Sequence, residues 1–228
     1  MRNTLILASV LPMAPPAASA ADGLSYTYVE GGWAGLQVHD SAAGDPEAGG
    51  GFIRGSFAIA EQVHVFGGYS RVSDTFGFDG ARSKVTLEQP YLGVGYHMPM
   101  SDRIDFTSDI SWVRRNAETK YTFDGLPTYR SKYHTNLGRA TVGVRGKPSP
   151  RTEAWAKAGY LDGSDVDGNW VGQLGGQFNY TPRVGWVMEV EAYGRSFEYT
   201  AGLRLSFCSA LSIMGTARMA VNTPSVYA

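Results

Sequence analysis

The clearest pattern in this chain is a strict alternation of apolar and polar residues near its C-terminal end. Between residues 197 and 207, Phe, Tyr, Ala, Leu, Leu and Phe occupy every second position, with Glu, Thr, Gly, Arg and Ser between them. Because neighbouring side chains of a strand point to opposite faces, this segment predicts a strand with one apolar and one polar face. Similar segments recur about ten times along the chain.

The connections between these segments alternate in length. Those after the first, third, fifth and seventh segments are long and polar (residues 39–48, 73–83, 116–131 and 162–169), and the others are short. A soluble barrel such as a lipocalin gives the same strand pattern but no reason for this asymmetry. The pattern is typical of an all-β, antiparallel up-and-down transmembrane β-barrel with long loops outside and short turns in the periplasm. We predict about ten strands, with eight as the alternative.

The N-terminus has the features of a secretion signal. Arg2 supplies a positive charge, residues 5–11 form a short apolar run, and Ala18-Ser19-Ala20 resembles a cleavage site. We therefore expect a signal peptide over residues 1–20, a barrel over 21–207, and the outer membrane as the location. Residues 208–228 lack alternation. They are interpreted either as a periplasmic tail or as translation past the natural stop.

Composition agrees with this reading and excludes some functions. The formal net charge of −1 offers no basic surface for nucleic acid. The lone Cys208 excludes an intrachain disulfide. Four of the five tryptophans fall near predicted strand ends, as in an aromatic belt at a membrane surface. These are Trp33, Trp112, Trp170 and Trp186.

The polar faces of the segments predict a charged interior. A barrel of eight to ten strands is filled by its own side chains, and buried charges must be paired. Six positive and six negative residues are predicted to form this lumen charge network: Arg54, Asp105, Asp109, Arg115, Arg139, Arg145, Glu153, Lys157, Glu189, Glu191, Glu198 and Arg204. Balanced signs favour a cross-linked core over an ion-selective pore, so a narrow solute channel is the second hypothesis.

Candidate chemistry is sparse. His64 and His97 flank predicted periplasmic turns, and His39 and His134 lie near the predicted outer rim without a Ser or Asp partner motif. Residues 162–168 are rich in aspartate but lack the distal Glu of a helix–loop–helix calcium site. We expect no catalytic, cofactor or metal site. A lipid- or peptide-modifying enzyme is the third hypothesis.

Residues 21–32, ADGLSYTYVEGG, resemble the mature start of a xanthomonad family of small outer-membrane barrels first described as activators of a rice immune receptor. The resemblance also fits the barrel length and the GLRLSF ending, and places the chain among small barrels of the OmpX and OmpA type. It implies outer-membrane and vesicle localisation, links to motility, biofilm and virulence, and no enzymatic activity. The partners expected are outer-membrane lipid and lipopolysaccharide, the barrel assembly machinery during biogenesis, and a host or cell-surface partner bound by the loops.

Overall fold

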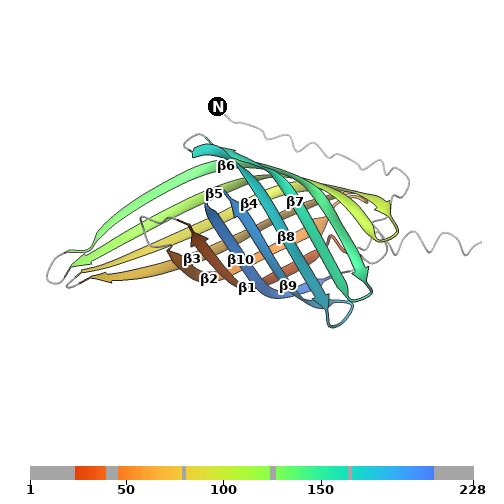
Figure 1. Cartoon of the computed structure of the whole chain (residues 1–228), viewed down its shortest axis with the longest axis horizontal. Coiled ribbons are helices and arrows are strands. Elements are labelled where there is room, and N and C mark those ends of the chain that lie inside the picture. Colours follow the sequence, from red (N-terminus) through yellow and green to blue (C-terminus); the bar gives the residue numbers. More distant parts are fainter. Residues whose placement is uncertain (1–23, 40–45, 79–80, 124–126, 164–165, 208–228) are drawn as a thin grey trace, which may run out of the picture.

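Ten antiparallel strands form a closed barrel (Figure 1). The computed structural model describes residues 24–39, 46–78, 81–123, 127–163 and 166–207. The strands are β1 (Tyr28–Val38), β2 (Glu47–Ala58), β3 (Val63–Phe78), β4 (Ala81–Ser101), β5 (Ile104–Phe123), β6 (Tyr129–Ser149), β7 (Thr152–Gly163), β8 (Val166–Asn179), β9 (Val184–Tyr193) and β10 (Ser196–Ser206). The ten-strand prediction is confirmed, and the eight-strand alternative is wrong. The expected signal peptide and C-terminal tail lie outside the described residues.

The two ends of the barrel differ. The turns after β2, β4, β6 and β8 define one end, called here the short-turn end. At the other end, β3 to β6 continue past their neighbours and extend to the left in Figure 1. Their outermost parts, residues 73–78, 81–88, 116–123 and 129–136, form a four-stranded sheet that we call the protrusion. Pairing of β2 with β3 stops at Ser73, and pairing of β6 with β7 stops at Leu137, so both edges of the protrusion are open.

The prediction of long loops is therefore wrong at three of four places. Residues 73–83 and 116–131 are mostly strand, with β5 and β6 paired from Tyr121 and Tyr129 inwards. Residues 162–169 also belong largely to β7 and β8. The first connection, after Val38, lies partly outside the described residues. The cause of the error is that strands leaving an apolar environment become polar on their outer face, and polarity alone resembles a loop.

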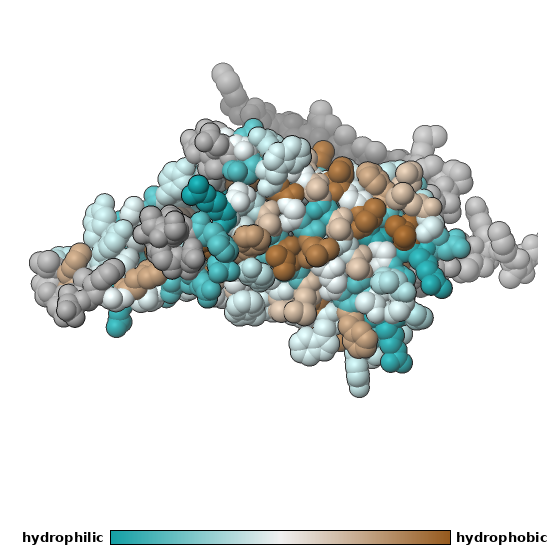
Figure 2. Space-filling view, viewed as in Figure 1, coloured by the Kyte–Doolittle hydropathy of each residue, from teal (hydrophilic) through white to brown (hydrophobic). Residues whose placement is uncertain are grey.

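The outer wall of the barrel is apolar. Ile53, Leu92, Leu174 and Met188 are each more than half exposed on outward-facing positions. In Figure 2, brown residues gather over the middle of the visible wall and teal residues flank them at both ends. The described residues contain no helix long and apolar enough to cross a membrane.

This apolar wall has a definite height. On β5 the outward face changes from Ile110 and Trp112 to Arg114 and later polar residues. On β7, Tyr160 follows the turn residue Arg151 by nine positions, which corresponds to about 23 Å at a strand tilt of about 40°. All four tryptophans of the predicted belt face outward. The placement near strand ends is wrong for Trp33, which lies in the middle of β1, and for Trp112, because β5 continues past it into the protrusion.

The barrel closes where β1 pairs with β10, and glycines allow the two backbones to approach. Gly32 lies opposite Gly202 in this ladder. A Cβ atom added at Gly202 would lie 2.3 Å from the carbonyl oxygen of Gly31, where no real Cβ fits. The hairpin from β9 to β10 also needs a glycine, since Gly194 has φ of 57°.

We expect Gly202→Val to destabilise the folded barrel by about 1–3 kcal/mol, because the seam must widen to admit the side chain. Urea unfolding in detergent micelles, followed by tryptophan fluorescence, measures the change. Gly172→Val on β8 is the matched control, because a Cβ there meets nothing within 4 Å. Equal losses for the two variants would show that the seam is not tightly packed.

Candidate functional site

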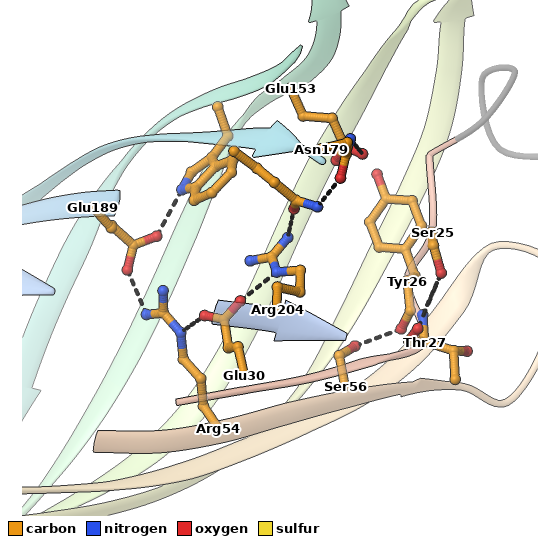
Figure 3. Close-up of polar contacts among 12 residues, drawn as sticks. Ser25, Tyr26, Thr27, Glu30, Arg54, Ser56, Glu153, Asn179, Glu189 and Arg204 are labelled. Carbon is orange, nitrogen blue, oxygen red and sulfur yellow. Dashed lines mark hydrogen bonds and ion pairs between the residues drawn. The ribbon is translucent and has the colours of Figure 1, made fainter. Parts of the chain in front are cut away.

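The inward face of the barrel carries a chain of charged contacts centred on Glu30 (Figure 3). The Glu30 carboxylate accepts hydrogen bonds from Arg54 of β2 and Arg204 of β10. Arg54 also donates to Glu189 of β9 at 2.5 Å, and the Trp155 indole donates to the other oxygen of Glu189 at 2.6 Å. The side chain of Glu30 is fully buried between the two guanidinium groups. Five strands, β1, β2, β7, β9 and β10, are tied together in this way.

The chain of contacts continues toward the short-turn end. Arg204 donates to Gln177 at 2.9 Å, and Gln177 donates to Asn179 at 2.5 Å. Asn179 donates to one oxygen of Glu153 at 3.3 Å, and Arg145 donates to the other at 2.6 Å. The network therefore runs without a break from β9 to β6 across the interior.

A second group of polar residues lies at the short-turn end. The Tyr26 hydroxyl donates to Asp105 at 2.8 Å, and its ring stacks on His97 with centroids 3.7 Å apart. Lys157 forms an ion pair with Asp109 at 2.5 Å. Because the segment before β1 carries Tyr26 into the interior, it helps to fill this mouth of the barrel.

The remaining predicted residues lie toward the protrusion. Arg139 forms an ion pair with Glu191 at 2.8 Å, and Arg115 donates to Gln89 at 3.0 Å. Glu198 lies directly across the ladder from Glu191. The structure thus places all twelve predicted charges at buried or half-buried positions, and four of the resulting ion pairs join two predicted residues.

Sequence reasoning missed Glu30, although in the first segment it lies on the same face as Tyr28 and Gly32, between Val29 and Gly31 of the opposite face. It also missed an apolar layer on the inward face, between the charged network and the protrusion. The buried side chains of this layer come from eight strands: Ala34, Phe52, Val72, Val113, Leu137, Leu161, Val171 and Tyr193, with the partly buried Leu36 and Tyr91 packed against them. The sequence did contain a sign of this layer, because each of these apolar residues interrupts the otherwise polar face of its segment.

The charged network surrounds a cavity of about 120 Å³, beside Tyr28, Arg54 and Arg139. That volume holds several water molecules. With the apolar layer on one side and Tyr26 on the other, the arrangement resembles a packed core.

The four histidines lie in three separate places. His64 and His97 are buried inside the barrel near Tyr26, with His64 Nε2 3.7 Å from an oxygen of Asp109. His134 is exposed on the protrusion, and His39 packs on Phe197 with centroids 5.4 Å apart. Among the described residues, no group of three or more His, Cys, Asp or Glu side chains could hold a metal ion.

Comparison with known proteins finds likeness in structure alone. No family model and no curated protein sequence matches the chain. Ail of Yersinia pestis is 11% identical over 80% of this chain and 99% of its own, with a TM-score of 0.44. The translocator domain of the autotransporter NalP from Neisseria meningitidis is 10% identical over 82% and 91%, with a TM-score of 0.49. The outer-membrane protease OmpT from Escherichia coli is 9% identical over 80% and 95%, with a TM-score of 0.46.

Proposed function

We propose that this chain is a non-enzymatic β-barrel of the bacterial outer membrane that presents the protrusion to partners outside the cell. The observation that carries the proposal is the outer wall, where large apolar side chains stay exposed over one height and then give way to polar ones. Water-soluble proteins seldom expose a continuous apolar surface of this size. Removal of a signal peptide near Ala20 and insertion by the barrel assembly machinery belong to the same proposal.

The protrusion is the part of the molecule best suited to contact a partner. Its inward face, which continues the lumen face of the barrel, carries exposed aromatic rings. Tyr121, Tyr129 and Tyr133 are 39%, 65% and 54% exposed, and the first two rings stack. Exposed aromatic side chains are enriched where proteins bind one another, and an open strand edge offers unpaired backbone groups. A host or cell-surface partner is therefore proposed to bind this face.

The finer role rests on the resemblance of residues 21–32 to the xanthomonad family. That resemblance supports a contribution to motility, biofilm or virulence and release in outer-membrane vesicles. Catalysis is not part of the proposal, because His64 and His97 are buried inside the barrel and His134 is exposed on the protrusion, far from both.

The alternative of a narrow channel gives a different electrical result. The ion pairs and the apolar layer pack across the interior, so we expect no steady conductance in planar lipid bilayers. The control is a double variant that opens the apolar layer, Leu137→Gly with Val171→Gly. A steady open level in the unaltered protein would favour the channel.

Orientation can be tested by labelling intact cells with a membrane-impermeant maleimide in a Cys208→Ser background. We expect Ser131→Cys, on the aromatic face of the protrusion, to react, and Arg103→Cys, in an exposed short turn, to react only after lysis. The reverse pattern would place the protrusion in the periplasm and overturn the proposed surface role.

The binding role is tested by replacing Tyr121, Tyr129 and Tyr133 with Ser and measuring surface attachment and biofilm formation. The matched control is Tyr180→Ser, since Tyr180 is 76% exposed at the short-turn end. We expect the triple variant alone to lose attachment while keeping heat-modifiable gel mobility. Unchanged attachment would remove the aromatic face from the proposal.

A further inference from the structure

The outward face of the protrusion is strongly basic, although the whole chain has a formal net charge of −1. This face continues the lipid-facing wall beyond Leu92 and Trp112. Among the described residues of this face, five are cations and two are carboxylates: Arg82, Lys84, Lys120, Arg130 and Lys132, with Glu88 and Glu118. Two further cations, Arg71 and Arg114, lie on the same side of β3 and β5 just below the protrusion. The excess positive charge is thus concentrated on one side of one sheet.

Three of these cations lie directly opposite one another across the strands. Lys84 of β4 pairs in register with Lys120 of β5, and Lys120 pairs with Arg130 of β6. Like charges at directly opposed positions destabilise a sheet. We call these three residues the cationic row. Lys84 and Arg130 are exposed, and Lys120 between them is half-exposed beside Glu118.

The nearby carboxylates do not neutralise the face. Glu118 lies 3.2 Å from Lys120 and 3.6 Å from Lys132, and Glu88 lies 3.6 Å from Arg71. Each carboxylate is therefore already engaged with a cation. An anion from outside the chain would relieve the repulsion within the cationic row.

The position of this face identifies the source of the anion. Because it continues the apolar wall, it points sideways into the head layer of the surrounding leaflet. Lys120 follows Trp112 by eight positions on β5, which places it about 20 Å above the apolar wall at a tilt of about 40°. Arg71 and Arg114 lie near the edge of that wall. A ligand that reaches all of them has anionic groups over a comparable height.

We propose that the outward face of the protrusion binds the phosphate groups of a glycolipid with a phosphorylated oligosaccharide head in the outer leaflet. A phospholipid has one phosphate at a single height and reaches only the lower cations. The inference rests on the proposed placement in the outer membrane. It adds that the protrusion is held by the leaflet on its basic side, which leaves the aromatic side available to a partner.

The test uses the full barrel in phosphatidylcholine nanodiscs that contain a fixed fraction of lipooligosaccharide. The variant replaces Lys84, Lys120 and Arg130 with Gln. The matched control removes three exposed cations at the short-turn end: Arg103→Gln, Arg151→Gln and Arg183→Gln. We expect the cationic-row variant to retain at least threefold less lipooligosaccharide than the control, and dephosphorylation of the lipooligosaccharide to abolish the difference.

A second measurement separates binding from folding. In detergent without glycolipid, loss of the cationic row should raise the melting temperature, because the repulsion is gone. With lipooligosaccharide present, the unaltered protein should melt higher than the variant. Equal retention by variant and control would overturn the inference, as would equally good retention of phosphatidylglycerol. The labelling of Ser131→Cys in cells reports on membrane placement independently of both results, because Ser131 lies on the opposite face of the protrusion.

Discussion

Glu30→Ala should lower the free energy of unfolding by about 3–5 kcal/mol, because it leaves two buried guanidinium groups without their shared carboxylate. Arg54 would still donate to Glu189, and Arg204 would still donate to Gln177. Neither contact replaces the negative charge of the Glu30 carboxylate that the two arginines share. Urea unfolding in detergent micelles or lipid vesicles measures the loss, and heat-modifiable gel mobility reports whether the barrel still forms.

Glu47→Ala is the matched control, since Glu47 is an exposed glutamate on the neighbouring strand β2. Its effect should lie within about 0.5 kcal/mol. Glu30→Gln should fall between the two, because the amide oxygen still accepts a hydrogen bond but carries no charge. If Glu30→Ala lowered the free energy of unfolding no more than Glu47→Ala, the two guanidinium groups would have to be hydrated by water in place of the carboxylate.

Val142→Arg should destabilise the barrel in lipid vesicles by about 2–4 kcal/mol, because the side chain would lie near the middle of the membrane. Val142 is 52% exposed on the outward face of β6. In a water-soluble barrel the same change would be nearly neutral, since exposed positions tolerate charge. Unfolding in vesicles of a neutral lipid provides the measurement.

The control for Val142→Arg lies on the same strand and the same face. His134 is exposed on the protrusion, eight positions before Val142 on β6, so His134→Arg should have little effect. Both variants introduce the same arginine on the same face at different heights. Similar losses for both would mean that the apolar wall does not lie in a bilayer.

Alternation along the chain predicted the faces of the strands correctly because it is a local property. Residues such as Arg139 and Glu191 could be assigned to the interior by counting in twos. Their pairing could not be predicted, since they are 52 positions apart and meet only when the barrel closes with a particular stagger. The same holds for Glu30, whose two partners lie on opposite sides of β1.

The protrusion was missed for a different reason. Residues 73–83 and 116–131 were interpreted as loops because they contain many polar side chains. Alternation was nevertheless present, with Val85 and Leu87 on one face of β4 and Lys84 and Thr86 on the other. A change of surroundings along one strand, from lipid to water, hides a regular strand from any rule based on polarity.

The seam between β1 and β10 also sets the order of events as the chain folds. The contact between Arg204 and Glu30 joins residues 174 positions apart, whereas all other ladders join strands that are neighbours in sequence. Contacts at such a separation carry a large entropy of chain closure and form late. Until β10 arrives, the edge of β1 is open and Glu30 lacks one of its two cations. The step that seals the wall is therefore also the step that completes the charge balance inside it, so a chain truncated before Arg204 should be recognisable to the cell as unfinished.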